Sequence, residues 1–295
     1  MTDALRAYVA DTLAAPVPAA VRHVAELLAK DAGAEAVLFY GSNLRTGSLD
    51  GVLDFYVLTA GARERGIWPR VGYREFAVGP ATLRAKIATM TLATFTAAAE
   101  GRSIDTTIWT RFVQPAALAQ ARSDAAASAV VDAIAEAAVT AARFAAALGP
   151  PEGNPADYWR ALFRQTYAAE LRVEARGREE QILTHGGDRY DTLLPLAWEA
   201  GGVPFVRDGS SLIARMPASE AARWRAKWAR RRRLGKPLNV VRLVRAAFTF
   251  DGAAKYGAWK IERHTGIAVA MTPWRERHPI LAAPGIFYRV WRARR

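Results

Sequence analysis

The chain has 295 residues, of which 51% are hydrophobic and 23% charged, so it is long enough to bury one large core or two smaller ones. It contains no cysteine, which excludes disulfides and thiolate metal sites and fits a reducing cytoplasm. The formal net charge is +13, and basic and acidic side chains balance over residues 1–150, so the whole surplus lies beyond residue 150.

The N-terminal segment predicts two amphipathic helices, over residues 3–14 and 18–32. In the second, apolar side chains such as Val21, Val24 and Leu28 recur near helical spacing. The first residues lack a basic start followed by an apolar core, so we expect neither a signal peptide nor a transit peptide.

Residues 36–58 carry the clearest chemical signal. A short apolar run over 37–40 predicts a buried strand, and Gly41-Ser42 predicts a sharp turn after it. Backbone N–H groups at such a turn favour phosphate oxygens, and glycine lets a phosphate approach the backbone. A second predicted strand over 52–58 carries Asp54, whose carboxylate suits Mg²⁺. The segment therefore predicts a nucleotide site that holds a metal ion.

The next elements are predicted to be a helix over 80–99, with Pro80 in its first turn, and a strand over 104–112 that begins beside Asp105. The most apolar window, 125–148, is interrupted by charged residues, so it predicts a buried or bundle helix rather than a membrane span. A turn-rich segment over 149–155 divides the chain into a domain of residues 1–149 and a mainly helical domain of residues 150–295.

The second half predicts helices over 157–176, 190–200, 217–233, 239–248 and 252–263, with basic residues concentrated between 223 and 260. Such a surface attracts polyanions, which include nucleotide phosphates, nucleic acid and anionic lipid headgroups. At the end of the chain, an apolar stripe among arginines over 286–295 indicates either an interfacial membrane helix or a terminal helix docked on its own domain. The four histidines have no metal-ligand spacing, and we expect structural roles for His23, His185, His264 and His278.

The strand, Gly-Ser turn and acidic strand resemble the DNA polymerase β nucleotidyltransferase superfamily. Tyr40-Gly41-Ser42 and Leu53-Asp54-Phe55 resemble one branch of it, the mitochondrial-type phosphatidate cytidylyltransferases of the translocator assembly and maintenance family. Most of the superfamily has a second acid two residues after the first, where this chain has Tyr56, and this branch tolerates a non-acidic residue there.

Further segments resemble that branch in the same order: 99–102, 129–152, 166–172 and 241–249. The chain departs from the family at two places: Asn43 replaces a second glycine, and Asp105-Thr106 stands where the family usually has Lys-Pro. No counterpart is found after Ile261. The resemblance implies an α/β fold with a nucleotidyltransferase-type mixed sheet and helices, followed by the mainly helical domain.

The resemblance also implies an activity and its partners. CTP and phosphatidate would give CDP-diacylglycerol and pyrophosphate, with Mg²⁺, on a cytoplasmic protein attached peripherally to an anionic membrane. The implied catalytic residues are Asp54, Asp50 and Asp105, with Asp54 and Asp50 on the metal. The implied nucleotide site comprises Tyr40, Gly41, Ser42, Asn43, Arg102, Tyr167 and Arg172, and the implied lipid or phosphate site comprises Arg242, Arg245 and Lys255.

Alternatives remain at this stage. Asp50, four residues before Asp54, is either a second metal ligand or a turn-capping acid, and Asp105 is either a third carboxylate or an exposed strand residue. Two rival functions are a related nucleotidyltransferase acting on RNA or a small alcohol, and a non-catalytic basic module that binds nucleic acid. Tyr56 favours the non-catalytic module, whereas the retained Asp54 and Arg172 argue against it.

Overall fold

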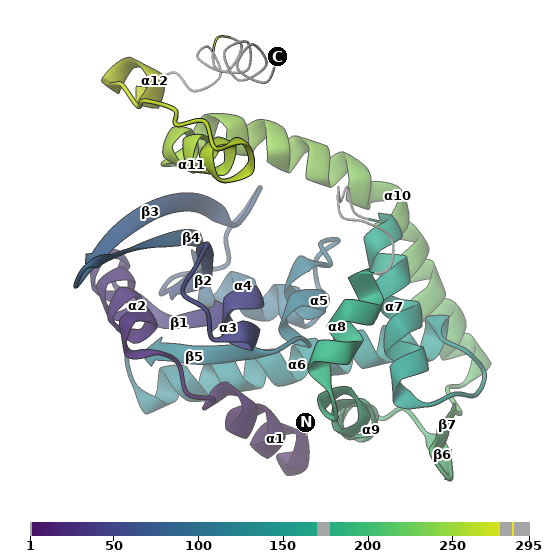
Figure 1. The fold of residues 1–295 in the computed structure, drawn as a ribbon. Helices are drawn as coiled ribbons and strands as arrows, with labels where there is room; N and C mark the ends of the chain where they lie inside the picture. Colours follow the sequence, from purple (N-terminus) through teal and green to yellow (C-terminus); the bar gives the residue numbers. More distant parts are fainter. Residues whose placement is uncertain (1, 170–177, 278–284, 286–295) are drawn as a thin grey trace.

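The computed structural model describes residues 2–169, 178–277 and 285 and has the mixed α/β fold that the sequence predicts. A five-stranded mixed sheet has the order β3-β4-β2-β1-β5 (Figure 1). Its strands are β1 (Ala34–Tyr40), β2 (Val52–Thr59), β3 (Arg70–Val78), β4 (Ala81–Thr91) and β5 (Ala116–Ala121). β2 runs parallel to β4, and the other neighbouring pairs are antiparallel.

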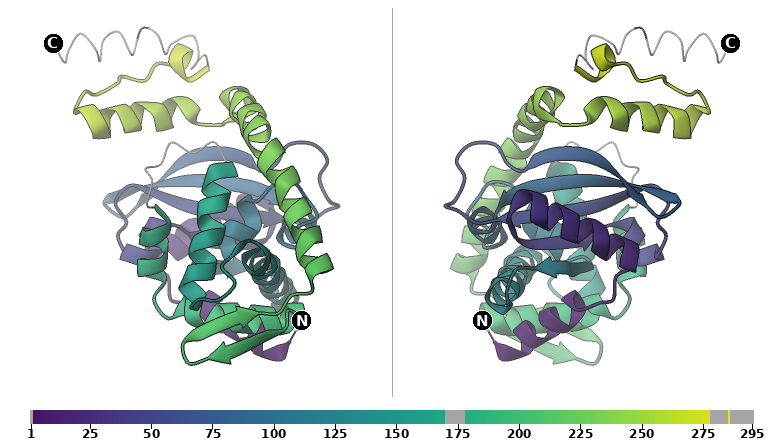
Figure 2. Two further views of the ribbon diagram at one scale, coloured as in Figure 1. Left: turned by 90° about the vertical axis from the view of Figure 1, so that its right-hand side faces the viewer. Right: turned by 90° about the vertical axis from the view of Figure 1, so that its left-hand side faces the viewer.

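Side chains of a strand alternate between the two faces of a sheet. Both faces of this sheet carry apolar side chains, and helices cover both. Val37 and Phe39 of β1 pack with α2 (Ala19–Ala32), which lies across one face (Figure 2, right). Leu38 and Tyr40 point to the opposite face, which is covered by helices from the N-terminus and the middle of the chain. These helices are α1 (Asp3–Leu13), α4 (Leu92–Ala99), α5 (Thr107–Phe112) and α6 (Asp124–Leu148).

The long helix α6 is the centre of this second core. It is the one helix in the described part of the chain that is long and apolar enough to span a bilayer, yet 67% of its most apolar window is buried inside the protein. Phe144 of α6 stacks on Trp109 and meets Trp224 edge to face. α6 therefore lies where the sequence predicts a buried helix.

The second half of the chain packs on α6 rather than apart from it. Its elements are α7 (Pro155–Ala169), α8 (Arg178–Gly186), α9 (Arg189–Gly201), the hairpin β6 (Phe205–Asp208) and β7 (Ser211–Ala214), α10 (Ala218–Thr249), α11 (Ala253–Thr265) and α12 (Pro273–Arg277). The indole of Trp198 donates to the carbonyl of Ala142 at 2.9 Å. One apolar core runs from Leu5 to Trp228 across residue 149. The division into two domains at that residue stays a prediction.

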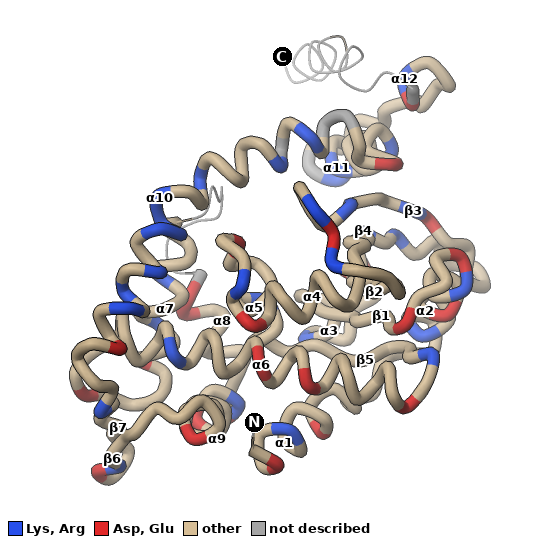
Figure 3. The backbone as a smooth tube through the Cα atoms, turned by 180° about the vertical axis from the view of Figure 1, so that it is seen from behind, with Lys and Arg blue, Asp and Glu red and all other residues tan. Residues whose placement is uncertain are grey.

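Helix α10 connects the two halves. Its buried Arg231 donates to the carbonyls of Gly101 and Ser103 at 2.6 and 2.7 Å, and burial lowers its pKa to about 10. Trp224 and Trp228 of α10 point inward to the core. Exposed Lys and Arg residues lie along α10 from residue 223 to residue 236, and the tube in Figure 3 marks the basic positions of this helix in blue. We call this the basic stripe; it comprises Arg223, Arg225, Arg230, Arg232, Arg233 and Lys236.

Three of the secondary-structure predictions differ from the structure. Residues 81–91 form strand β4, and only 92–99 are helical. The predicted strand over 104–112 is a loop followed by α5, whose Ile108, Trp109 and Phe112 are buried at helical spacing. The helices predicted over 217–233 and 239–248 are one helix that contains Pro237. The apolar stripe over 286–295 lies outside the described residues.

Candidate active site

The Gly-Ser turn and the acidic strand meet because β1 and β2 pair antiparallel. Tyr40, the last residue of β1, lies opposite Asp54 in this pairing. Gly41 follows with φ 97° and ψ −164°, a conformation that residues with a side chain rarely adopt. A Cβ atom at Gly41 would lie 2.9 Å from Oδ2 of Asp54. Glycine is therefore required both for the turn and for the close approach of the carboxylate.

The loop after the turn is held by its own side chains. Ser42–Thr46 form the short helix α3, and the buried amide of Asn43 donates to the carbonyls of Ser48 and Asp50 at 2.9 and 2.8 Å. The nucleotide role implied for Asn43 is untested, and its side-chain amide is already committed to this loop. The Asp50 side chain is exposed at the surface.

A cavity of about 200 Å³ lies in front of the turn, and we call it the Asp54 cavity. It is lined by residues from β1, β2, α3, α7 and α8 and from α5 and the segment after it: Tyr40, Gly41, Ser42, Arg45, Asp54, Arg111, Gln114, Pro115, Tyr167 and Ile182. The structure thus brings together five of the implied site residues, namely Tyr40, Gly41, Ser42, Asp54 and Tyr167.

The Asp54 side chain is partly buried, and desolvation raises the pKa of its carboxyl, although the charges of Lys86 and Arg111 oppose this shift. No hydrogen bond or ion pair within the described ranges reaches this carboxylate. The guanidinium of Arg111 lies over the ring of Tyr40, 4.8 Å from its centroid. Asp54 is therefore a desolvated carboxylate beside a cavity, and a bound cation would stabilise its charge.

Tyr56 lies on the same face of β2 as Asp54, where the resemblance would otherwise predict a second acid. Its ring packs against Tyr40 and Phe112, with centroids 5.4 and 5.3 Å apart, and the residue is 2% exposed. Burial raises the pKa of its hydroxyl, so it stays protonated. Tyr56 fills the core at this position, and a protonated phenol does not replace a carboxylate on a metal ion.

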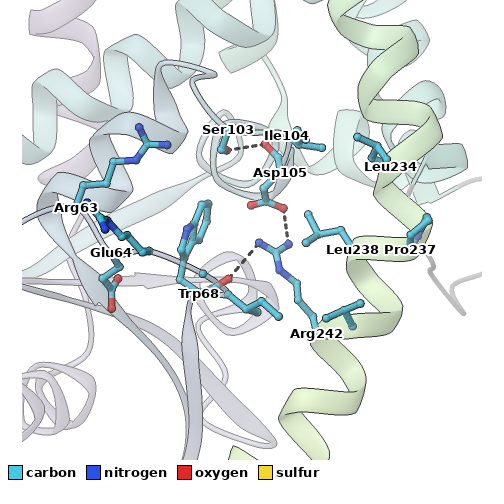
Figure 4. Close-up of a pocket in the computed structure, with 14 residues that line it drawn as sticks. Arg63, Glu64, Trp68, Ser103, Ile104, Asp105, Leu234, Pro237, Leu238 and Arg242 are labelled. Carbon is cyan, nitrogen blue, oxygen red and sulfur yellow. Dashed lines mark hydrogen bonds and ion pairs between the residues drawn. The ribbon is translucent and has the colours of Figure 1, made fainter.

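Asp105 is neither an exposed strand residue nor part of the Asp54 cavity. It is 6% exposed and forms an ion pair with Arg242 at 2.5 Å (Figure 4). It also accepts a hydrogen bond from the hydroxyl of Thr107 at 2.8 Å. Arg242 also donates to the carbonyl of Trp68. Asp105 therefore has a cation beside it already, in a second cavity lined by α10.

The remaining implied site residues lie elsewhere. Arg102 is exposed and pairs with Glu100 at 2.7 Å, Arg245 donates to the carbonyl of Ile67, and Lys255 pairs with Glu276 at 3.3 Å. Arg172 lies outside the described residues. Among the residues that the structure describes, no three His, Cys, Asp or Glu side chains gather as a metal cluster.

Three polar residues of the Asp54 cavity were not singled out from the sequence: Arg45, Arg111 and Gln114. Arg45 lies just after the Gly41-Ser42 turn, so its closeness in sequence to the predicted phosphate site could have identified it. Arg111 and Gln114 were not recognisable, since the residues around them were predicted to be a strand. The two arginines make the cavity suited to an anion, and Asp54 makes it suited to a cation. A metal–triphosphate complex combines both charges.

This chain matches no protein-family model and no curated protein. The case for a function therefore depends on the geometry of the site and on the short resembling segments.

Proposed function

We propose that the Asp54 cavity binds the phosphates of a nucleoside triphosphate and that the chain transfers the nucleotidyl group. The observation that carries the proposal is the pairing of Tyr40 with Asp54, because it puts the Gly41-Ser42 turn and a desolvated carboxylate in one cavity with Arg45 and Arg111. A cavity of about 200 Å³ is smaller than pockets that enclose whole ligands, about 300–1,000 Å³. It suits the phosphates, with the nucleoside extending outside.

The Asp54 carboxylate can hold Mg²⁺ as its one protein ligand. Mg²⁺ is usually held by one or two carboxylates together with substrate phosphates and water, so Asp54 alone is sufficient. The exposed Asp50 and the ion-paired Asp105 are not needed in this arrangement. When bound, the metal ion supplies positive charge to the reacting phosphates.

The chain's own residues orient the triphosphate. Backbone N–H groups at Gly41-Ser42 and the guanidinium groups of Arg45 and Arg111 are the donors that line the cavity, and phosphates are recognised by such groups. Donors that are fixed before the substrate arrives stabilise the charge that develops during transfer. The packed Tyr40 and Tyr56 rings hold β1 and β2 in place behind the site.

The resemblance supports CTP as donor and phosphatidate as acceptor. An oxygen of the lipid phosphate attacks the α-phosphorus in line, a new P–O bond forms, the bond to the β-phosphate breaks, and pyrophosphate leaves. CDP-diacylglycerol is the second product, and no covalent intermediate with the enzyme is required. The basic stripe of α10 suits peripheral attachment to an anionic membrane from the cytoplasm.

The test is a reaction of the purified chain with α-labelled CTP, Mg²⁺ and vesicles that contain phosphatidate. We expect labelled CDP-diacylglycerol and pyrophosphate, and no product when EDTA replaces Mg²⁺. Vesicles with phosphatidylglycerol in place of phosphatidate are also anionic but have no phosphomonoester to attack, and should give none. Labelling of tRNA or an oligonucleotide, with phosphatidate ignored, would overturn the lipid acceptor and leave nucleotidyl transfer standing.

A second candidate is a nucleotide- or nucleic-acid-binding module without catalysis. It is favoured by one observation: Tyr56 is aromatic and Asp105 is neutralised by Arg242, so the Asp54 cavity holds a single carboxylate among the described residues. Binding of CTP without pyrophosphate release from any acceptor would support it. Binding to duplex RNA that weakens steeply as salt rises would identify the basic stripe as the contact.

A further inference from the structure

A second cavity, larger than the Asp54 cavity, shares no described lining residue with it and is not used by the proposed function. It has a volume of about 820 Å³ and lies between the β2–β3 loop and α10 (Figure 4). We call it the Trp68 cavity, after the side chain in its wall. Its size is typical of a pocket that encloses a small ligand.

The two walls of the Trp68 cavity are apolar. Ile67, Trp68 and Ile104 lie on one side, and α10 contributes its own apolar residues from the other: Leu234, Leu238 and Val241. This apolar surface continues outside, because Val244, three residues after Val241 on α10, is 57% exposed. An apolar strip that runs from a cavity onto the surface suits a flexible hydrocarbon chain.

The charges at the cavity are divided between its inner part and its mouth. Inside, Arg242 is paired with Asp105 and lies over the ring of Trp68, so its charge is already neutralised. At the mouth, Arg63 and Arg65 are exposed, and neither guanidinium has a hydrogen bond or ion pair with any described residue. The carboxylate of Glu64 between them instead accepts the backbone N–H of Thr91 at 3.1 Å. The mouth is therefore positively charged.

We propose that the Trp68 cavity binds the acyl chain of an anionic lipid, with the chain along α10 and the headgroup at Arg63 and Arg65. A nucleoside fits less well, because its base and sugar hydroxyls would face apolar walls without partners. The polar groups of Arg242 are already bonded to Asp105 and to the Trp68 carbonyl. This binding does not require nucleotidyl transfer, so either proposal can fail without the other.

The first test is calorimetric titration of the whole chain with dodecyl phosphate below its critical micelle concentration. Removal of two methylene groups should weaken binding about fifteenfold, because each buried methylene contributes about fourfold. Inorganic phosphate, which has the anion alone, should bind at least about a hundredfold more weakly. Dodecyl maltoside, which has the chain alone, should also bind more weakly. Affinity that is independent of chain length would overturn the proposal.

The second test uses matched variants on exposed positions. Val241→Asp puts a charge in the wall of the cavity and should weaken dodecyl phosphate binding at least about tenfold. Val240→Asp is the control, since the two valines are 49% and 47% exposed and only Val241 lines the cavity. Equal effects of the two substitutions would overturn the proposal.

The headgroup contact is tested in the same way. The double variant Arg63→Ala/Arg65→Ala should lose about threefold or more in affinity for dodecyl phosphate and little for dodecyl maltoside. The control is Arg230→Ala/Arg232→Ala in the basic stripe, which removes the same charge away from the cavity. An equal loss in both double variants would mean that net charge alone attracts the ligand. The proposed headgroup contact at Arg63 and Arg65 would then be wrong.

Discussion

The Asp54 and Trp68 cavities each contain an aspartate near an arginine, yet the two aspartates have different chemistry. Asp105 pairs with Arg242 at 2.5 Å, whereas Asp54 has no ion pair within the described ranges and its pKa is raised by burial. The two carboxylates have different partners because different backbone segments lie against them. Gly41 brings a turn against the Asp54 carboxylate without a side chain between them, whereas Asp105 faces a helix that supplies a cation.

A buried carboxylate is therefore identified as a site by its partners rather than by its burial. A carboxylate with an arginine in contact is already neutralised and stabilises the fold. A carboxylate without one makes folding less favourable, and such groups persist where a ligand stabilises their charge. This comparison supports the proposal that Asp54 binds a ligand and that Asp105 stabilises the fold.

The largest expected effect follows removal of the Asp54 charge. Asp54→Asn should lower nucleotidyl transfer by about a thousandfold, which corresponds to about 4 kcal/mol of transition-state stabilisation. The measurement is pyrophosphate release from CTP. Retention of more than about a tenth of the wild-type rate, a difference of only about 1.4 kcal/mol, would remove Asp54 from the reaction.

Loss of the ion pair between Asp105 and Arg242 should instead affect folding. Arg242→Met leaves Asp105 buried without its cation and should lower the free energy of unfolding by about 3 kcal/mol, as measured by urea denaturation. Affinity for CTP should change less than about threefold. Arg230→Met, an exposed position on the same helix, should change stability by less than about 0.5 kcal/mol. If Arg242→Met abolishes CTP binding in a folded protein, the two cavities are not independent.

The close approach of the Asp54 carboxylate to the Gly41-Ser42 turn can be tested by substituting two glycines. Gly41→Ala should lower CTP affinity about tenfold, since its Cβ would lie 2.9 Å from the Asp54 carboxylate. Gly47→Ala is the control, because Gly47 also has a positive φ, 68°, but no atom lies within 4 Å of its added Cβ. The control should lose about 1 kcal/mol of stability and no affinity. Equal affinity losses would assign the effect to backbone strain.

The smallest effect is the pH dependence of stability. Because the pKa of Asp54 is raised in the folded state, the folded protein binds the proton more tightly than the unfolded chain does. The contribution of Asp54 to stability therefore falls as pH rises from its unfolded pKa through its folded pKa. Asp54→Asn should gain stability relative to wild type over this rise, as measured by urea denaturation at each pH. A relative loss would indicate an ion pair at Asp54.

Much of the fold and part of the site were predictable from local sequence. Apolar runs and the Gly41-Ser42 turn predicted β1, β2 and the position of Asp54. β4 was mistaken for a helix, because Leu83, Ile87 and Met90 fit helical spacing, although Leu83, Ala85 and Ile87 also alternate as in a strand. β5 gave no signal, since its residues are mostly alanine and form a strand by pairing with β1.

The role of Asp105 could not be predicted from its surroundings. Its cation, Arg242, lies 137 residues away and reaches it only through the packing of α10. The same applies to Arg111, which enters the Asp54 cavity from α5, whereas Tyr167 was implied by the family resemblance. The local sequence pattern identifies one residue of a site, such as Asp54. The other side chains of the site come from distant segments and are brought there by tertiary packing.

The most direct measurement is a crystal structure of the chain with a non-hydrolysable CTP analogue and Mn²⁺, located by its anomalous scattering. We expect the Mn²⁺ peak at the Asp54 carboxylate and the triphosphate in the Asp54 cavity beside Gly41-Ser42. A triphosphate bound on the basic stripe or at Arg63 and Arg65, with no Mn²⁺ at Asp54, would contradict the proposed active site.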